Sequence, residues 1–479
     1  MDKKVTTAEL ITQSLAMLCI SLLACQTGYI CAWPSYTTSN FESNSTLLDR
    51  PMSAWEISLL GSLPNFGALL ASPFCGLAFN ILGRKYATIF FGLPYVITWT
   101  IISLTDNVIL VLVAMSIAGV GVAGQNVAII YVSEIAHDSI RGGLTAFSSS
   151  GYIIGLLTSY ILGGKLTYQQ VVYTHLGFSV MTMLLLTLLR ESPVFLVMKG
   201  REEEAEKSIA FYKRLKIGSK DIAFEIDKIR LQINPSSEKT YLPVDTEEAK
   251  DLAKHEEQQV EQKPTSSWKF LMKSKSSQRA LATVLIIMTL IILMGCVVLQ
   301  VYAEPLFKEA VPSMPPNQCA ILLAVDFLIA SLVCVFIIDK FGRKPLLIVT
   351  AAISGVCMFL LGLQLQTHFA PHWFTVLIIY TYSFVYMLGC AAIPFVLSAE
   401  LFLPEVRSLC NSITMVCLWS VNFVTLLVFK PLAEWLGLGI VFYCFSMFSF
   451  VGVLFGYAYI PETKGLSVDA IQLLFLKKK

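Results

Sequence analysis

Charged residues are scarce in this chain. Only 14% of its 479 residues are Asp, Glu, Lys or Arg, whereas soluble domains carry roughly 25%. Hydrophobic residues make up 55% of the sequence, and the mean hydropathy is +0.68. The net charge of +2 offers no attraction to nucleic acid. The composition therefore indicates a protein that lives in a lipid bilayer.

The chain also lacks the motifs of catalysis. It contains no nucleotide-binding glycine loop, no metal-ligand spacing and no nucleophile–base constellation. We therefore expect no enzymatic activity, no cofactor and no metal site. Most of the 12 cysteines lie inside apolar runs, where they act as small buried side chains. Cys25 and Cys31 are a candidate disulfide pair. The N-terminus lacks a cleavage site, so its apolar stretch is interpreted as a first spanning helix.

Long apolar stretches make up most of the sequence. About 20 apolar residues are needed to cross the hydrocarbon core, and twelve stretches qualify: near 10–31, 54–79, 86–104, 108–133, 143–163, 170–189, 280–303, 317–338, 345–365, 373–398, 408–429 and 438–460. They predict an all-α membrane protein with an N-terminal six-helix bundle (1–190), a polar helical linker (191–279), a C-terminal six-helix bundle (280–460) and a tail (461–479). Within the linker, 201–232 has helical periodicity, and 234–266 has the composition of a flexible segment.

The distribution of Lys and Arg predicts the orientation, because basic residues favour the cytoplasmic side. With both termini inside, the short inner loops hold Arg84, Lys85, Arg141, Lys340, Arg343, Lys344 and Arg407. The outer loops hold only Arg50, Lys165, Lys308 and Lys430. The sequon at Asn44 falls in the first outer loop, so we expect a glycosylated protein of the plasma membrane.

A charged signature occurs once in each half. The first copy comprises Gly83-Arg84-Lys85, Glu134 with Arg141, and Glu191-Ser192-Pro193. The second comprises Gly342-Arg343-Lys344, Glu400 with Arg407, and Pro461-Glu462-Thr463. Two like halves with charges on one side of the bilayer are typical of a transporter. Charges that meet in one conformation and part in another would form a latch between two states.

These motifs resemble those of the sugar porter branch of the major facilitator superfamily. The resemblance extends over essentially the whole chain, and it rests on Leu82 to Lys85, Tyr131 to Glu134 with Arg141-Gly142, Glu191 to Pro193, Asp339 to Lys344, Ala399 to Phe402 with Pro404 and Arg407, and Pro461 to Gly465. Within the branch, Tyr302 to Ala310 is similar to the insect trehalose and glucose facilitators. The resemblance implies alternating access to one central site for a small molecule. It also implies a gating network of Arg84, Glu134, Arg141, Glu191, Asp339, Arg343, Glu400, Arg407 and Glu462.

One position departs from the family pattern in this network. The family has an acid three residues before the first Gly-Arg-Lys, and Asn80 occupies that position, while the second half keeps Asp339. Asparagine can accept a hydrogen bond but carries no charge. We therefore expect a weaker inner latch in the N-terminal half.

The sugar-binding positions implied by the family are mostly apolar here. Its polar residues fall on Ile291, Ile292, Val297, Met387 and Leu418. Ser149 replaces a glutamine and Phe395 a tryptophan, whereas Trp419 and Asn422 are kept. Polar side chains elsewhere in the spans, such as Gln125 and Gln300, either contact ligand or join helices. The candidate substrate-binding residues are Ser149, Asp326, Phe395, Trp419 and Asn422.

Two further features bear on mechanism. The first span has no acidic residue between Leu10 and Cys31, where proton-coupled members of the family use Asp. Its absence favours facilitated diffusion, although Asp326 in the eighth span keeps a proton-coupled alternative open. In the tenth span, Ala391-Ala392 replaces the Gly-Pro of the family, so we expect a stiffer helix there.

The sequence leaves three candidate functions. The first is a facilitative transporter of trehalose or a hexose. The second, favoured by the altered sugar cage, is a transporter of another small organic solute. The third is a sensor that binds sugar without moving it.

Overall fold

The computed structural model describes residues 6–233 and 267–464 together with 471 and 474. The expected flexible segment 234–266 and most of the expected tail lie outside the described residues. The described chain is helical and contains no strand.

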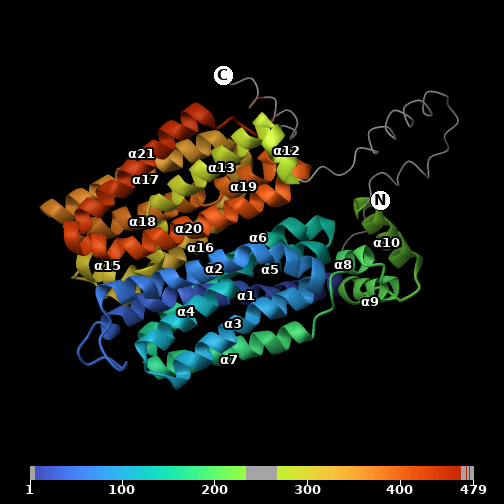
Figure 1. Cartoon of the computed structure of the whole chain (residues 1–479), viewed down its shortest axis with the longest axis horizontal. Helices are drawn as coiled ribbons and strands as arrows, with labels where there is room; N and C mark the ends of the chain where they lie inside the picture. The colour runs from blue at the N-terminus through green and yellow to red at the C-terminus, as the bar shows by residue number, and fades with distance from the viewer. Residues whose placement is uncertain (1–5, 234–266, 465–470, 472–473, 475–479) are drawn as a thin grey trace.

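The N-terminal half forms one six-helix bundle (Figure 1). Its helices are α1 (Thr7–Phe41), α2 (Ala54–Leu82), α3 (Arg84–Leu104), α4 (Val108–Ala123), α5 (Gln125–Ile135), α6 (Asp138–Lys165) and α7 (Tyr168–Thr187). α4 and α5 together make one span. Packing of α1 on α6, α2 on α4, and α3 on both α4 and α7 holds the bundle together.

The C-terminal half repeats this arrangement. It contains α13 (Lys275–Leu293), α14 (Cys296–Val301), α15 (Ala303–Ala310), α16 (Pro316–Phe341), α17 (Arg343–Thr367), α18 (His372–Leu388), α19 (Ile393–Leu401), α20 (Pro404–Leu436) and α21 (Leu438–Tyr459). α17 packs on α21 and α18, and α13 packs on α20 and α21. The two halves meet along two seams, α2 against α20 and α6 against α16.

Short helices gather at one end of the molecule (Figure 1). They are α8 (Pro193–Met198), α9 (Glu202–Lys213), α10 (Lys220–Ile233) and α12 (Ser267–Lys273). We call this the linker end, and the other end of the bundles the loop end. The first span is longer than its expected range of 10–31, because the helix continues through Pro34 to Phe41 at the loop end.

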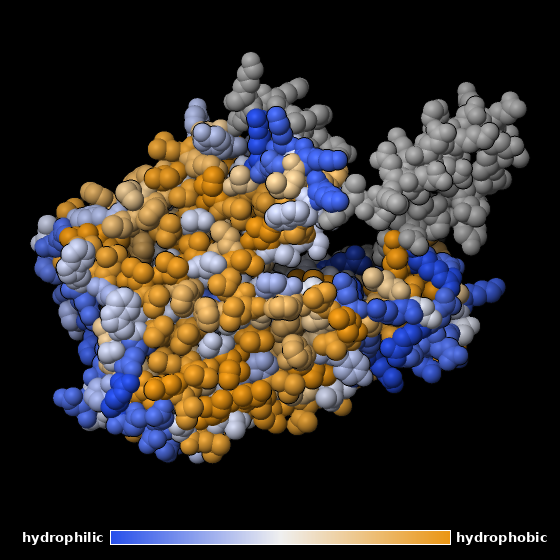
Figure 2. Space-filling view, viewed as in Figure 1, coloured by the Kyte–Doolittle hydropathy of each residue, from blue (hydrophilic) through white to orange (hydrophobic). Residues whose placement is uncertain are grey.

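The surface agrees with a protein that spans a bilayer several times. Twelve helices of the described chain are long and apolar enough to cross a membrane, as the sequence predicts. Large apolar side chains such as Leu104 and Phe336 are about 80% exposed, which is stable only where lipid covers them. Figure 2 shows apolar residues over the broad middle of both bundles and polar residues gathered at the two ends. Cys25 and Cys31 are both free, so the candidate disulfide does not form.

Three spans are interrupted, each at a glycine. The fourth breaks at Gly124, the seventh at Gly295, and the tenth between Leu388 and Ile393. Gly295 has φ +92, a conformation that favours glycine. In the tenth span, Gly389 lies against Thr350, and Pro394 supplies no backbone donor to the next turn. The expectation of a stiffer tenth helix is therefore wrong, because replacing Gly-Pro by two alanines does not remove these two breakers.

Close backbone contact joins α1 to α6. A Cβ atom on Gly155 would stand 2.1 Å from the carbonyl oxygen of Cys25, and one on Gly28 would stand 2.3 Å from that of Tyr152. Small residues of this kind let membrane helices approach closely, since no hydrophobic force draws them together within lipid. This contact fixes the position of α6, which lines the centre of the protein.

We expect Gly155→Ala to destabilise the protein by about 1–3 kcal/mol, the usual cost of overpacking. Gly177→Ala is the matched control, because no atom lies within 4 Å of its added Cβ. Thermal unfolding of the two variants in one detergent measures the difference. Equal midpoints would contradict the role of Gly155 as a spacer.

Candidate functional site

A carboxylate, an arginine and a helix N-terminus meet at the linker end of the N-terminal half. The carboxylate of Glu191 accepts hydrogen bonds from the backbone N–H groups of Arg84 (2.8 Å) and Lys85 (3.0 Å), at the start of α3. The guanidinium of Arg84 reaches across to Glu134 on α5, with its closest contact at 2.7 Å. The Ser192 hydroxyl donates to the same Glu134 carboxylate. We call this set the N-clamp.

The C-terminal half repeats the same geometry. Glu462 accepts from the backbone N–H groups of Arg343 and Lys344, both at 3.1 Å, at the start of α17. Arg343 pairs with Glu400 at 3.0 Å, and the Thr463 hydroxyl donates to Glu400 at 2.5 Å. This is the C-clamp. Thr463 occupies the place that Ser192 holds in the N-clamp.

Both clamps depend on a glycine and on a helix dipole. Gly83 and Gly342 have φ +87, and a Cβ atom there would stand 2.5 Å from Glu191 and 2.8 Å from Glu462, respectively. A carboxylate at a helix N-terminus is favoured by the free N–H groups and by the dipole. Burial opposes ionisation of Glu462, but four backbone N–H donors outweigh it and hold its pKa below the usual value.

The clamps therefore lock each bundle internally. Glu134 and Arg141 lie on different helices, because the chain turns at Ala136 and His137 between α5 and α6. The ion pairs of Glu134 and Glu400 described above run to the arginine of the Gly-Arg-Lys turn in the same half. They fix the α2–α3 and α16–α17 turns in the described conformation, and the latch between two states expected of these charges remains a prediction.

The linker helices are attached to the N-clamp through Tyr212 of α9. Its hydroxyl donates to the carbonyl of Arg190 (2.6 Å) and lies 3.0 Å from the Tyr131 hydroxyl on α5. Burial raises the pKa of Tyr212, so its hydroxyl stays protonated and keeps its donor role. Gln13 of α1 donates to the Tyr212 carbonyl and accepts from the His137 N–H. A movement of α9 is thus transmitted directly to α1 and α5.

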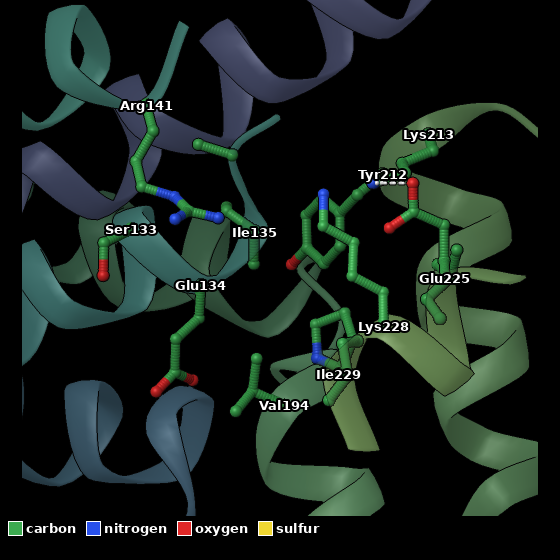
Figure 3. Close-up of a pocket in the computed structure, with 13 residues that line it drawn as sticks. Ser133, Glu134, Ile135, Arg141, Val194, Tyr212, Lys213, Glu225, Lys228 and Ile229 are labelled. Carbon is green, nitrogen blue, oxygen red and sulfur yellow. Dashed lines mark ion pairs between the residues drawn. The ribbon is translucent and has the colours of Figure 1, made fainter. Parts of the chain in front are cut away.

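A charged pocket of about 230 Å³ lies between these helices and the N-terminal bundle (Figure 3). Arg141 faces it, together with Lys228 and the ion pair of Lys213 with Glu225 at 2.6 Å. In the other half, Arg407 donates to the Phe402 carbonyl at 3.3 Å.

The weaker N-terminal latch expected from Asn80 remains a prediction. Asn80 is exposed near the end of α2. Its counterpart Asp339 lies near the end of α16, and its side chain lies outside the described part of the structure.

A central cavity of about 420 Å³ lies between the two halves. The N-terminal half contributes Gln125, Ser149, Ser150, Tyr152 and Ile153. The C-terminal half contributes Ser331, Cys334, Val335, Ile338, Met387, Ala391 and Ala392. Most of these residues lie on α6 and α16, with Gln125 from α5 and Met387 from α18. Figure 2 shows a recess between the bundles at the linker end. The size suits a small molecule.

Polar contacts between the halves close the protein on the loop-end side of this cavity. Tyr152 donates from α6 to the Gln300 side chain on α14 (2.7 Å), and Tyr160 donates to the Gln300 carbonyl. Asn317 of α16 donates to the Tyr160 carbonyl at 2.9 Å. Nearer the loop end, the N–H of Glu304 donates to Ser35 of α1. Tyr152 and Gln300 therefore form the floor of the cavity.

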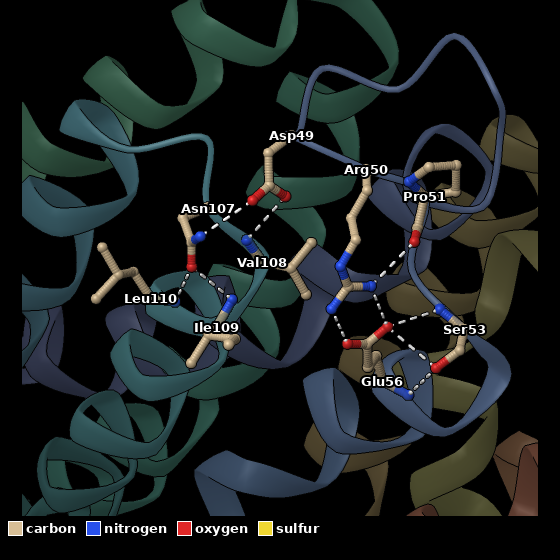
Figure 4. A network of polar contacts seen from close by, with 9 residues as sticks. All are labelled: Asp49, Arg50, Pro51, Ser53, Glu56, Asn107, Val108, Ile109 and Leu110. Carbon is tan, nitrogen blue, oxygen red and sulfur yellow. Dashed lines mark hydrogen bonds and ion pairs between the residues drawn. The ribbon is translucent and has the colours of Figure 1, made fainter.

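An ion pair joins the halves at the outermost point of the loop end. Glu42, at the end of α1, pairs with Lys430 of α20, and their side chains are 38% and 18% exposed. The neighbouring loop is ordered by contacts within the N-terminal half (Figure 4), where Arg50 pairs with Glu56 and Asp49 accepts from Asn107. Asn44 is exposed on this loop, as a glycosylation site requires.

The structure does not gather the predicted substrate-binding residues into one site. Only Ser149 lines the central cavity. Asp326 accepts a hydrogen bond from Ser383 of α18 inside the C-terminal half. Phe395 is 42% exposed on α19, Trp419 is half-buried on α20, and Asn422 is buried. Their roles in binding stay predictions.

Comparison with known proteins shows which family the chain belongs to. The family model for the sugar (and other) transporters matches residues 16–475. The chain belongs to this family. Facilitated trehalose transporter Tret1 of Drosophila virilis is 24% identical over 472 residues, which are 96% of this chain and 48% of that protein. The protein of the same name from Culex quinquefasciatus is 24% identical over 478 residues, which are 96% of this chain and 85% of that protein. The chain spans about half the length of the Drosophila relatives.

Solved structures of the family have the same fold. The xylose transporter XylE of E. coli in its inward open conformation superposes with a TM-score of 0.76 at 18% identity, covering 96% of this chain and 99% of that one. Its partially occluded inward open form gives 0.72 at 18% identity, covering 94% and 100%.

Sequence reasoning missed some residues of this sugar-transporter scaffold. Ser192 and Thr463 follow the clamp carboxylates directly, and their shared spacing was visible in the repeated signature. The pairing of Glu42 with Lys430 had no such signal, because 388 positions separate the two residues. The cavity role of Cys334, Val335 and Ile338 was hidden as well, since apolar residues in a spanning helix usually face lipid or core.

We expect Arg84→Met to destabilise the protein by about 3 kcal/mol, because it leaves the Glu134 carboxylate without its cation in a mostly buried site. The two side chains are only 10% and 14% exposed. Arg230→Met is the control, since the Arg230–Glu202 pair is 48% and 55% exposed and should cost at most about 1 kcal/mol. Thermal unfolding measures both. Similar losses in the two variants would show that the N-clamp has no special role.

Proposed function

We propose that this protein is a facilitative transporter that moves trehalose or a hexose across a membrane by alternating access. The observation that carries the proposal is the central cavity, which lies between two repeated bundles and is closed on one side by polar contacts between them. A site that two internally locked bodies share can open to either side when the bodies rock. The trehalose transporter relatives support the class of cargo.

We further propose that the linker end is cytoplasmic and that the protein resides in the plasma membrane with both termini inside. The excess of Lys and Arg at the linker end and the exposed sequon at the loop end support this orientation. In this orientation, the described conformation faces the cytoplasm, in agreement with its superposition on the inward open XylE.

The second candidate is a carrier of a less polar organic solute, and the apolar C-terminal wall of the cavity favours it. Its proton-coupled form would use Asp326, which is held by Ser383. The third candidate, a sensor, differs from both by binding without flux.

We expect the purified protein in proteoliposomes to equilibrate radiolabelled trehalose or glucose without accumulating it, because α1 carries no acid between Leu10 and Cys31 for proton coupling. Uptake with and without a pH gradient measures this, and protein-free liposomes are the control. Accumulation driven by the pH gradient and lost in Asp326→Asn would establish the proton-coupled alternative. Binding without flux would establish the sensor.

Alternating access makes a second prediction at the loop end. Glu42→Lys should weaken closure there by about 1 kcal/mol, roughly a fivefold shift toward the state open at the loop end. Adding Lys430→Glu should restore closure, since the pair re-forms with reversed charges. The readout is modification of a cysteine introduced at Ile57, which is fully buried in this conformation, by a membrane-impermeant thiol reagent.

Arg50→Glu is the matched control for this experiment. It disrupts a loop-end ion pair that lies within one half, so the rate of modification should stay unchanged. If Glu42→Lys and Arg50→Glu behave alike, or if the double reversal fails to restore protection, Glu42 and Lys430 do not hold the gate.

A further inference from the structure

The two walls of the central cavity differ in chemistry. On the N-terminal wall, the amide of Gln125 finds no hydrogen-bond partner among the described residues, so it is available to a ligand. Ser149 is exposed to the cavity, and because its hydroxyl donates to the Thr145 carbonyl at 3.0 Å, its oxygen can still accept. This wall can therefore pair hydroxyl groups of a bound molecule.

The C-terminal wall is largely apolar. Val335 and Ile338 of α16 and Met387 of α18 face the cavity with Cys334 and Ala391. The exception is Ser331, whose hydroxyl donates to the Leu328 carbonyl at 2.9 Å. The C-terminal wall thus offers contact area and almost no hydrogen bonding.

A free hexose or disaccharide, the cargo proposed above, can pair only part of its hydroxyls between these walls. Its hydroxyls surround the ring, so those that face Val335, Ile338 and Met387 would lose water without gaining a partner. Each unpaired hydroxyl lowers affinity by about tenfold or more. An apolar substituent on that side would instead gain from burial.

We infer that the preferred ligand of this cavity is a glycoside with an apolar aglycone. Its sugar ring lies against Gln125 and Ser149, and its aglycone lies against Val335, Ile338 and Met387. The inference rests on the proposed function, because it takes the cavity to be the site that holds the cargo. The volume of about 420 Å³ is in the range of pockets that hold small ligands.

Four ligands of graded chemistry test the inference on the full-length protein in nanodiscs. Glucose, phenyl β-D-glucoside and cellobiose share one sugar ring, while the second group is absent, apolar or polar; phenol alone is the control for the aromatic group. Calorimetric titration should give phenyl glucoside about tenfold tighter binding than glucose, and cellobiose no tighter than glucose. Equal binding of phenyl glucoside and cellobiose overturns the inference, as does phenol binding as tightly as phenyl glucoside.

Two variants test whether the apolar wall causes the preference for phenyl glucoside. Val335→Thr is nearly isosteric and adds a hydroxyl to the apolar wall, and Met387→Gln adds an amide at similar length. Each should reduce the preference for phenyl glucoside over glucose to about threefold or less. Val333→Thr is the matched control on α16, because Val333 does not line the cavity, and it should keep the tenfold preference. A preference unchanged in all three variants overturns the inference, since the aglycone then binds elsewhere.

A flux measurement distinguishes failure of this inference from failure of the proposed function. If phenyl glucoside binds tightly and Val335→Thr abolishes the preference, but no sugar or glycoside crosses the proteoliposome membrane, the ligand class stands and transport fails. If glucose crosses and phenyl glucoside competes no better than cellobiose, transport stands and the ligand class fails.

Discussion

The binding of a helix N-terminus by a half-buried carboxylate is the interaction on which the rest of this structure depends. Glu191 and Glu462 each hold the first N–H groups of the helix that follows a Gly-Arg-Lys turn. The arginine of that turn is thereby aimed at a second carboxylate, Glu134 or Glu400. Because these contacts close within one half, they tie the helices of each bundle to one another, while the two halves meet along the seams of α2 with α20 and α6 with α16.

This arrangement separates the machinery of movement from the chemistry of recognition. The clamps occupy the linker end, and the residues proposed to contact a solute line the central cavity, whose loop-end side is closed by Tyr152 and Gln300. Substitutions in the cavity wall, such as Met387 or Val335, therefore leave the clamps untouched. A scaffold built in this way can exchange one cargo for another while it keeps its mechanism, so membership in a family constrains movement more than ligand.

The fold could be read from the sequence because its signals are local and repeated. Apolar length defined the twelve spans, and the signature around Arg84 and Arg343 marked the two halves. The break at Gly295 was missed, since a lone glycine in an apolar run does not reveal whether its φ is positive. The pairing of Glu42 with Lys430 depends on how two distant helix ends meet, and one sequence carries no record of that.

The interruptions at Gly124, Gly295 and Gly389 divide the fourth, seventh and tenth spans into shorter helices, with a joint at each glycine. Gln125 and Met387, which line the cavity, and Gln300, which forms its floor, lie within two turns of such a joint. A continuous helix would have to tilt along its whole length to release a solute, against the elasticity of both bundles and the surrounding lipid. A jointed helix can bend at one point at lower cost. In the proposed transport cycle, such local bends would seal a bound solute from both sides before the two bundles complete their rotation.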